Sequence, residues 1–213
     1  MRHSLLLSVA GVGLASVVAA GQAANLEKMS KLRNPAALNE QAPPTYKVNL
    51  DTSKGPIVIE VHRDWAPLAA DRFYNLVTNG FYDEARFFRV VPNFMVQFGM
   101  NADPAVTRAW SSVPMKDEPT TQSNKKGYVT FARTGAPNSR GTQVFINYKD
   151  NGFLDNQGFA PFGQVTEGMD VAEKISAMYG EKPNQGEITA SGNAYLNKAF
   201  PKLDYVKKAT IAK

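Results

Sequence analysis

The feature that most constrains the fold is a series of short runs of aromatic and β-branched residues, each bounded by glycine, proline or asparagine. In the first run Tyr46, Val48 and Leu50 alternate with polar residues, and a Thr-Ser-Lys-Gly turn leads into a second alternating run over 57–61. This period of two predicts a hairpin of half-buried strands. Further strands are predicted at 87–91, 94–98, 128–132, 144–148, 159–165 and 205–211. About eight short strands favour an antiparallel sheet closed into a barrel, because closure leaves no exposed edge.

Two amphipathic helices are predicted beside these strands. In the first, Asp64 is placed to cap the N-terminus, Pro67 lies in the first turn and Gly80 ends the helix. The second is predicted over 169–179, where apolar residues recur on one face before Gly180. We therefore expect a mainly β fold, an eight-stranded antiparallel closed barrel with the two α-helices covering its open ends.

The N-terminus has the three parts of a secretory signal peptide: a basic start, an apolar run over 5–20 and a Gly-Gln-Ala step at 21–23. A membrane anchor is the alternative, but glycine and serine dilute this run, whereas a span needs about 20 strongly apolar residues. We predict a signal peptide over 1–23, a polar linker or N-terminal arm over 24–44 in which prolines break any helix, and one domain over 45–213. The mature protein is expected in the periplasm or secreted, and free of the membrane.

Composition excludes several kinds of site. The chain of 213 residues has no cysteine, which rules out disulfides, thiol catalysis and thiolate metal sites. It has two histidines, of which one lies in the predicted leader, and this leaves little room for a multi-histidine metal centre. The formal net charge is +5, from 24 basic and 19 acidic residues. The basic residues are spread along the chain rather than gathered in a stripe, so nucleic-acid binding is not expected. Neither a metal nor a cofactor is predicted.

Three motifs that suggest chemistry are better explained without it. The segment 135–142 lacks the lysine and the glycine spacing of a phosphate-binding loop. His62 ends a strand with no serine nucleophile motif near it, which favours a solvent-facing histidine over a catalytic one. Asp117 and Glu118 are neighbours in a loop, and we predict that they are exposed rather than a glycosidase pair.

Arg89 is the most informative residue, because it interrupts a Phe-Phe-Arg-Val-Val run that is otherwise apolar on both faces. An unpaired buried guanidinium is costly, so this side chain forms an ion pair, reaches water from an edge strand, or serves a site. Strand parity places Met95 and Gln97 on one face of their strand, and Gln143 and Phe145 share a face in the same way. An arginine, two glutamines and soft or aromatic apolar groups suit a peptide, with donors for its carbonyls and a pocket for a compact ring.

At these residues the chain resembles the cyclophilin-type peptidyl-prolyl cis-trans isomerases, in particular the exported bacterial ones. The resemblance spans about residues 45 to 211 and implies the family's eight-stranded barrel capped by two helices. It also implies that the protein is a monomer that catalyses rotation about X-Pro bonds of unfolded or extended polypeptides. The resemblance implies neither a cofactor nor a covalent intermediate. The motifs that carry it lie at 73–77 (Phe-Tyr-Asn-Leu-Val), 80–83 (Gly-Phe-Tyr-Asp), 87–97 (Phe-Phe-Arg-Val-Val-Pro-Asn-Phe-Met-Val-Gln), 138–147 (Asn-Ser-Arg-Gly-Thr-Gln-Val-Phe-Ile-Asn), 153–155 (Phe-Leu-Asp) and 162–165 (Phe-Gly-Gln-Val).

Carried over position by position, the resemblance implies that Arg89 is the catalytic residue. The remaining positions would bind the substrate, some as walls of a proline pocket and others as partners of the extended chain. The pocket walls are Phe94, Met95, Phe145 and Leu154; the other contacts are the side chains of Gln97 and Gln143, the main chain of Ala132 and Arg133, and the rings of Phe153 and Phe159.

The chain also departs from the family pattern. Phe88 stands where a histidine often precedes the arginine, and a Phe-Gly-Met step replaces the usual Gly-Gly-Asp after Gln97. The glycine-rich loop that normally follows is replaced over 105–110, so that rim of the groove is left unassigned. Phe153 replaces a common tryptophan, and strong binding of the family inhibitor cyclosporin is therefore not expected. Phe159 matches a common histidine only approximately, because one residue is inserted before it.

Two other functions are compatible with parts of this pattern. A chaperone that holds proline-containing chains in the same groove would not need to turn them over. A lipocalin-like carrier would need a hollow barrel, whereas the interior here is predicted to be packed and the site to lie outside it. An Arg89 turned away and locked onto a carboxylate, with no hollow beside it, would contradict the catalytic assignment.

Overall fold

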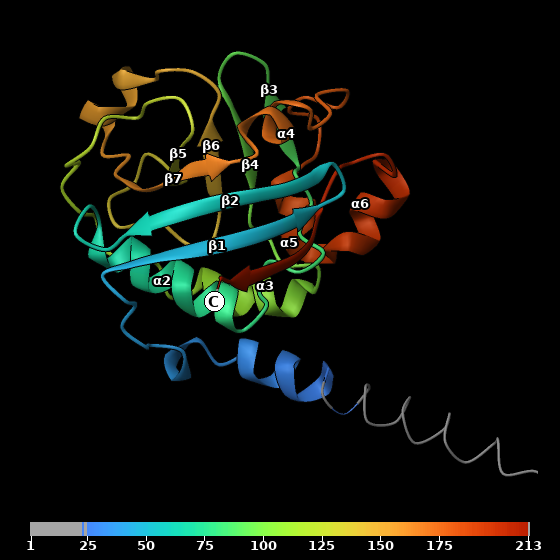
Figure 1. Ribbon diagram of the computed structural model, residues 1–213. Coiled ribbons are helices and arrows are strands. Elements are labelled where there is room, and N and C mark those ends of the chain that lie inside the picture. The colour runs from blue at the N-terminus through green and yellow to red at the C-terminus, as the bar shows by residue number, and fades with distance from the viewer. Residues whose placement is uncertain (1–22, 24, 213) are drawn as a thin grey trace, which may run out of the picture.

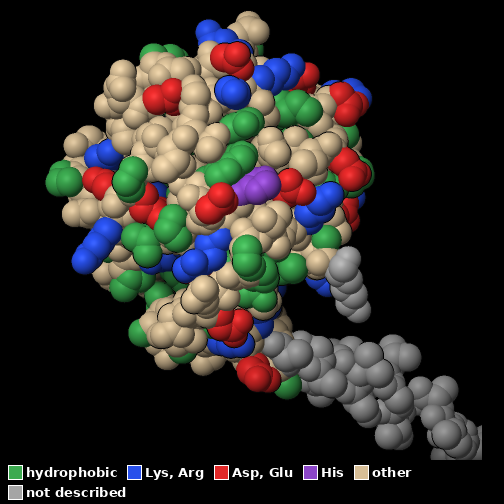
Figure 2. All heavy atoms as spheres, turned by 60° about the vertical axis from the view of Figure 1, so that its left-hand side comes forward, with side chains coloured by type: hydrophobic (Ala, Val, Ile, Leu, Met, Phe, Trp, Pro, Cys, Tyr) green, Lys and Arg blue, Asp and Glu red, His purple; other side chains and the backbone are tan. Residues whose placement is uncertain are grey.

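The computed structural model describes residues 23 and 25–212 (Figure 1). The apolar run at 5–20, whether leader or anchor, lies outside these residues, as does nearly all of the predicted signal peptide. Within the described part of the chain no helix is both long and apolar enough to cross a membrane. Figure 2 shows acidic and basic side chains interspersed over the face that it presents.

Eight antiparallel strands form one strongly curled sheet, which confirms the mainly β prediction (Figure 1). The strand order is β3-β4-β6-β5-β7-β2-β1-β8, and each pair of neighbours is antiparallel. Most observed strands lie within two residues of the predicted limits. They are β1 (Thr45–Thr52), β2 (Gly55–His62), β3 (Arg89–Val91), β4 (Met95–Phe98), β5 (Tyr128–Phe131), β6 (Val144–Asn147), β7 (Pro161–Glu167) and β8 (Val206–Ile211).

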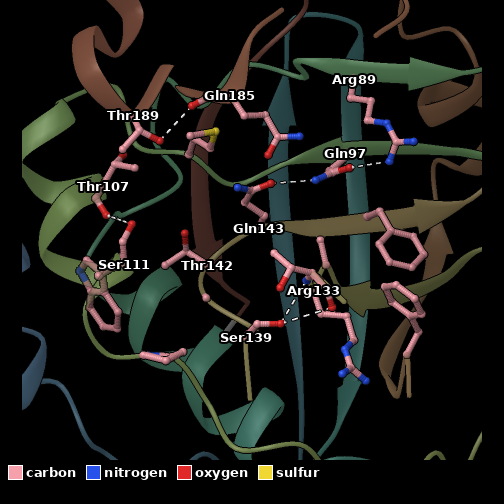
Figure 3. A pocket seen from close by; sticks show the side chains of 18 of the residues that line it. Arg89, Gln97, Thr107, Ser111, Arg133, Ser139, Thr142, Gln143, Gln185 and Thr189 are labelled. Carbon is pink, nitrogen blue, oxygen red and sulfur yellow. Dashed lines mark hydrogen bonds between the residues drawn. The ribbon is translucent and has the colours of Figure 1, made fainter. Parts of the chain in front are cut away.

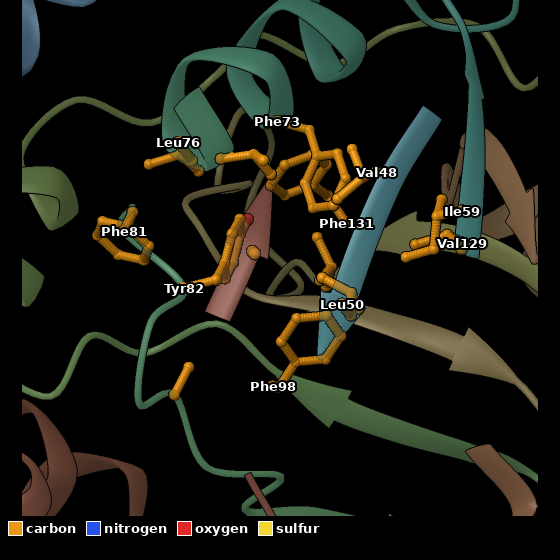
Figure 4. Close-up of a cluster of buried hydrophobic side chains, with 14 of the residues drawn as sticks. Val48, Leu50, Ile59, Phe73, Leu76, Phe81, Tyr82, Phe98, Val129 and Phe131 are labelled. Atoms are coloured by element: carbon orange, nitrogen blue, oxygen red, sulfur yellow. The ribbon is translucent and has the colours of Figure 1, made fainter. Parts of the chain in front are cut away.

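In the hairpin of β1 and β2, the alternation of apolar and polar residues in the sequence corresponds to an alternation of buried and exposed side chains. Tyr46, Val48 and Leu50 are buried while their neighbours in β1 are exposed, and β2 buries Ile57, Ile59 and Val61. These side chains meet aromatic residues from other strands and from a helix inside the curled sheet, as Figure 4 shows for Val48, Leu50 and Phe131. The interior is packed with side chains, so the hollow barrel that a lipocalin-like carrier needs is not present in the described structure.

The two end strands of the sheet, β3 and β8, are not joined by a strand ladder. Main-chain contacts just before each strand connect them instead: Arg86 forms an isolated bridge with Tyr205, and the amide of Phe87 donates to the carbonyl of Asp204 at 2.9 Å. The amide of Val206 donates to the carbonyl of Ala85 at 2.9 Å. We refer to this line as the β3–β8 seam. It leaves β3 as an edge strand that is paired by a ladder on one side only.

More helices are present than the two predicted. The first predicted helix is α2, and it packs near the start of β1, where the Tyr46 hydroxyl donates to the carbonyl of Ala70. The second corresponds to α4, and it lies at the opposite end of the hairpin, where Val171 faces Gly55. The α-helices are a segment at 25–32, α2 (Pro67–Thr78), α3 (Pro104–Ser111), α4 (Met169–Glu173), α5 (Gln185–Ser191) and α6 (Asn193–Ala199), and two short 3-10 helices are η1 (Pro35–Ala37) and η2 (Gly152–Gln157).

Helix α4 is shorter than the helix predicted over 169–179. It ends at Glu173, although Ile175 is buried as the pattern requires. The cause is a competing acceptor: the amide of Ser176 donates to the carboxylate of Asp204 at 2.8 Å rather than continuing the helix. A side-chain acceptor that replaces a main-chain one in this way is a common reason for a helix to end.

The N-terminal cap of α2 is a second correction. Asp64 does not cap this helix, whose first residue follows Ala66. Glu118 caps it from a distant loop, accepting hydrogen bonds from the amides of Leu68 at 2.6 Å and Ala69 at 3.1 Å. The prediction that Glu118 is exposed is therefore wrong: only 6% of its side chain is accessible, because the guanidinium of Arg140 lies 2.9 Å away and neutralises it. The other end agrees with prediction, since Gly80 adopts a left-handed φ of 69° directly after the helix.

Residues 25–42 contain a helix and pack against the rest of the described chain. Their helix at 25–32 precedes the prolines that were expected to break it, so regular structure begins well before residue 45. Leu32 is fully buried, and its carbonyl accepts a hydrogen bond from the indole of Trp110 in α3 at 2.8 Å. The arm is tied further by an ion pair between Arg33 and Asp103 at 2.5 Å. The division of the chain at residues 23 and 44 stays a prediction.

Candidate functional site

A surface cavity of about 420 Å³ lies outside the packed interior, against the outer faces of β4 and β6. Strand parity explains its position. Val96 and Phe98 of β4 point into the core, so Met95 and Gln97 point outward into the cavity. Ten of the eleven predicted site residues line this one cavity: Arg89, Phe94, Met95, Gln97, Ala132, Arg133, Gln143, Phe145, Leu154 and Phe159.

The remaining predicted residue, Phe153, lies at the edge of this group and does not line the cavity. It is 57% exposed, and its ring stacks on that of Phe94 with centroids 6.0 Å apart. An exposed aromatic ring beside an apolar pocket is available to a bound peptide, but the geometry does not place Phe153 in the pocket wall.

One end of the cavity is apolar. Met95, Phe145 and Leu154 form a buried cluster separate from the main core, with Phe94, Ala132 and Phe159 packed around it. Phe145 meets Phe159 edge to face, with ring centroids 5.9 Å apart. These groups come from β4, β6 and η2 and the loops beside them, and together they form a compact apolar recess of the kind that holds a small ring.

A row of hydrogen-bonded polar side chains borders this recess (Figure 3). Arg89 and Gln97 are register partners across β3 and β4, and Nη1 of Arg89 donates to Oε1 of Gln97 at 3.1 Å. Nε2 of Gln97 in turn donates to Oε1 of Gln143 at 2.7 Å. The row fixes the orientation of both amides and presents charged and neutral donors to the cavity.

Arg89 has a second partner that the sequence did not predict. Its Nε donates to Oε1 of Glu181 at 2.6 Å, and its Nη2 lies 2.6 Å from the same oxygen. Glu181 is 92 positions away in the chain, and no local pattern marks it. The guanidinium is thus paired with a carboxylate, yet it also lines the open cavity and contacts Gln97, so the condition that would contradict a catalytic role is not met.

The main chain at Ala132 and Arg133 offers two free groups to the cavity. The amide of Ala132 is occupied, because it donates to the carbonyl of Gln143 at 2.8 Å. The carbonyl of Ala132 and the amide of Arg133 have no hydrogen-bond partner within residues 25–212. One acceptor and one donor on adjacent residues can pair with an extended peptide as a neighbouring strand would. The Arg133 side chain turns away, donating to the carbonyl of Gln157 at 2.9 Å.

The opposite end of the cavity carries several hydroxyl and amide groups and is formed in part by helices that were not predicted from the sequence. The replaced loop at 105–110 forms α3, capped by Asp103, whose carboxylate accepts from the amide of Ala105 at 2.8 Å. Burial raises the pKa of Asp103, but hydrogen bonds from Arg33 and from Ala105 outweigh it and leave that pKa below its ordinary value. The lining residues at this end are Thr107, Trp110, Ser111, Thr142, Gln185 and Thr189.

The departure from the family pattern at Phe88 has a structural cause in helices α5 and α6. It is 1% exposed and points away from the main core into a second apolar cluster. Its partners there include Ile188 of α5, Leu196 of α6 and Leu203. An apolar side chain at position 88 is therefore required by the segment 179–203, which packs against this side of β3.

Of the three motifs set aside in the sequence, only the segment 135–142 reaches the cavity, where Ser139, Gly141 and Thr142 line it. His62 does not line the cavity; it stacks on Trp65 with centroids 4.3 Å apart, and its Nε2 lies 3.1 Å from a carboxylate oxygen of Glu60. Glu118 caps α2. In the described part of the chain no group of three or more histidine or acidic residues is placed to hold a metal ion.

Known proteins of one family match most of this chain. Residues 47–192 match the family described as cyclophilin type peptidyl-prolyl cis-trans isomerase/CLD. A peptidyl-prolyl cis-trans isomerase of Acinetobacter baylyi is 39% identical over 134 residues, which cover 61% of this chain and 71% of that protein. Peptidyl-prolyl cis-trans isomerase B of Escherichia coli is 32% identical over 167 residues, covering 75% and 94%. A crystal structure of a Cryptosporidium parvum cyclophilin superposes with a TM-score of 0.62 at 22% identity, covering 79% of this chain and 98% of that one.

Proposed function

Because this chain belongs to the cyclophilin-type peptidyl-prolyl cis-trans isomerases, we propose that Arg89 is the residue that accelerates rotation about X-Pro bonds. The observation that carries this proposal is the position of Arg89 beside a recess that fits a proline ring. The guanidinium, the two glutamines and the apolar cluster share one cavity, and Arg133 is the only other charged residue in its described lining.

The barrier that has to be lowered belongs to the amide itself. Rotation about an X-Pro bond costs about 18–20 kcal/mol, because the planar amide has partial double-bond character. At the top of the barrier the conjugation is broken and the proline nitrogen regains a lone pair. A free N–H of Arg89 donates to this lone pair, and the interaction is absent in the planar ground state, so it lowers the barrier. No bond forms between enzyme and substrate.

The energies are of the right order. A turnover of about 10³ per second corresponds to a barrier of about 13–14 kcal/mol, so about 5 kcal/mol has to be supplied. A hydrogen bond from a charged donor contributes about 1.5–3 kcal/mol. The recess contributes the rest by holding the ring while the acyl side turns, and by surrounding the less dipolar twisted amide with apolar groups.

The substrate is a proline-containing polypeptide in extended form. The carbonyl of Ala132 and the amide of Arg133 pair with its backbone, and the ring enters the recess lined by Met95 and Phe145. A related Cryptosporidium parvum cyclophilin was crystallised in the presence of the dipeptide Ala-Pro, which supports a proline-containing ligand. The fold of that protein matches this one with a TM-score of 0.61 at 21% identity.

Export of the protein is part of the proposal. The basic start, the apolar run over 5–20 and the Gly-Gln-Ala step at 21–23 support a cleaved signal peptide and a mature protein in the periplasm or outside the cell. The resemblance to the family supports a monomer. Its clients would then be exported chains that fold after translocation. N-terminal sequencing of the mature protein tests this, with residue 24 expected as the first; a chain that retains its leader would contradict it.

Exchange between the cis and trans forms of an Ala-Pro peptide, measured by NMR, tests the role of Arg89. Arg89→Ala is expected to lower the catalysed rate by about ten- to 150-fold, the equivalent of a charged hydrogen bond. Arg63→Ala is a matched control, since both arginines contact a carboxylate and their side chains are 30% and 33% exposed. It should leave the rate unchanged.

The same pair of variants separates catalysis from simple binding. Peptide affinity should be largely retained in Arg89→Ala, because the recess and the main-chain partners remain. An unchanged rate in Arg89→Ala would show that the arginine is not the catalytic group. Peptide binding by the wild type without faster exchange would identify the groove as that of a chaperone.

A further inference from the structure

Glu181 is held beside Arg89 by contacts on both sides of that arginine. On one side, the amide of Val90 donates to the carbonyl of Gly180 at 3.1 Å, which attaches the segment to the edge of β3. On the other side, Phe88 lies in the second apolar cluster, against which Tyr179 packs. Val90 therefore contacts Gly180 directly, and Phe88 and Tyr179 belong to the same apolar cluster.

The local turn directs the carboxylate toward the guanidinium. Gly180 has a left-handed φ of 56°, and its amide donates to the carbonyl of Ala177 at 3.0 Å. The amide of Lys182 donates to the carbonyl of Tyr179 at 3.0 Å, which closes the turn around position 181. Beyond it, Asn184 caps α5 and accepts from the amide of Glu187 at 3.1 Å. The backbone on either side of Glu181 is thus fixed by hydrogen bonds.

A count of the guanidinium donors shows what this contact leaves free. An arginine has five N–H groups in a planar fork. Glu181 occupies the edge formed by Nε and Nη2, with both nitrogens 2.6 Å from Oε1, and Gln97 accepts one N–H of Nη1 at 3.1 Å. The free N–H groups are the second one on Nη1 and the outer one on Nη2. The free N–H of Nη2 lies at the end of the fork, on the side away from the Nε edge.

An arginine on an edge strand has no intrinsic reason to stay in one rotamer. The side chain of Arg89 is 33% exposed, and its long stem has several rotatable bonds. Gln97 alone contacts a single nitrogen and would allow the fork to turn about that bond. Contacts on two edges fix both the position and the plane of the fork before substrate arrives, which removes an ordering cost from the reaction.

We propose that Glu181 is a positioning residue for Arg89, which holds the free end of the guanidinium toward the twisting X-Pro bond. This inference rests on the proposed role of Arg89 and adds Glu181 to the residues on which the site depends. Glu181 touches no substrate; it acts through the arginine. Because it engages donors that the reaction does not use, its effect is on the turnover of bound peptide rather than on binding.

The opposite effect would follow if the ion pair withheld Arg89 from substrate. In that case the carboxylate would have to be displaced in each cycle, and its removal would make turnover faster. The donor count favours positioning, since two N–H groups remain free while the pair is intact. The two readings therefore predict changes of opposite sign for the same variant.

Glu181→Gln tests the inference, since it keeps the size of the side chain and removes its charge. NMR exchange at saturating Ala-Pro peptide is expected to show kcat lower by about tenfold, with KM within about twofold of the wild type. Glu187→Gln is the control, because this exposed residue lies in the neighbouring helix α5 and makes no ion pair in the described structure. It should change neither constant.

A double-mutant cycle and a spectroscopic signal complete the test. In an Arg89→Ala background, Glu181→Gln is expected to change kcat by less than about twofold, because there is no guanidinium left to position. The Nε–H signal of Arg89, identified by its loss in Arg89→Ala, should exchange slowly with water in the wild type and faster in Glu181→Gln. An equal loss of turnover in both backgrounds, a faster Glu181→Gln enzyme, or an unchanged Nε–H signal would overturn the inference. An Arg89→Ala enzyme with normal turnover would instead overturn the proposed function.

Discussion

Replacement of Glu118 by glutamine should destabilise the protein more than any other single change in its loop. Glu118 and Arg140 have side chains that are 6% and 1% exposed, and they lie 2.9 Å apart. The glutamine can still accept from the amides at the start of α2, but the charge of Arg140 is left buried without a counter-ion. Removal of one partner of a buried ion pair costs about 3–5 kcal/mol.

The charge of Arg72 adds to the destabilisation expected for Glu118→Gln. Burial lowers the pKa of Arg72, and the charge of Arg140 lowers it further. Without Glu118 the mutual repulsion of the two arginines is no longer offset. For a domain of this size about 1 kcal/mol corresponds to 2–4 °C, so the expected fall in Tm is about 6–20 °C.

Urea unfolding measures the effect, and the neighbouring carboxylate provides the control. Asp117→Asn should cost less than about 1 kcal/mol, because that side chain is 33% exposed and lies 3.5 Å from its partner Arg133. The double variant Glu118→Gln with Arg140→Met should recover most of the loss, since no buried charge then remains. Equal midpoints for Glu118→Gln and Asp117→Asn, or no recovery in the double variant, would refute the reasoning.

Three further changes test other parts of the structure. Phe145→Ala removes a wall of the recess and should raise KM for an Ala-Pro peptide about tenfold or more, the equivalent of the burial of one aromatic ring; an unchanged KM would place the ring elsewhere. Hydrogen bonds from Ser123 and Asn124 outweigh burial and lower the pKa of Asp155, so its contribution to stability is complete above the unfolded pKa of about 4 and is lost as pH falls through the lower folded value. Asp155→Asn should therefore flatten the fall in Tm below about pH 4, and an identical acid profile would contradict this. Deletion of residues 24–42 uncovers the pocket of the buried Leu32 and should lower the free energy of unfolding by about 3–6 kcal/mol, measured in urea; no change in midpoint would show that the arm is dispensable.

Much of the sheet was predictable because its information is local. The alternation in β1 and β2, the turn between them and the apolar run that contains Arg89 each specify a strand within a few residues. The cavity followed for the same reason: parity in β4 places Gln97 outward, and pairing with β3 places it opposite Arg89.

The parts that were missed depend on partners far away in the chain. Asp204 ends α4 through the amide of Ser176, and Glu118 caps α2 from a loop that comes about 50 residues later. Glu181 reaches Arg89 over 92 positions. Neither local propensity nor periodicity reports such contacts, since they exist only once the sheet has curled and its loops have met.

The β3–β8 seam has a consequence for how this scaffold can change. The strand that carries Arg89 is tied to the barrel by a ladder on one side and by the segment 179–203 on the other. Substitutions or length changes in that segment can therefore alter the position of the Arg89 side chain while the other seven strands keep their registers. The catalytic rate or the range of clients can therefore change in evolution through this segment while the barrel stays the same. A sheet whose two end strands are not joined by a ladder allows such changes.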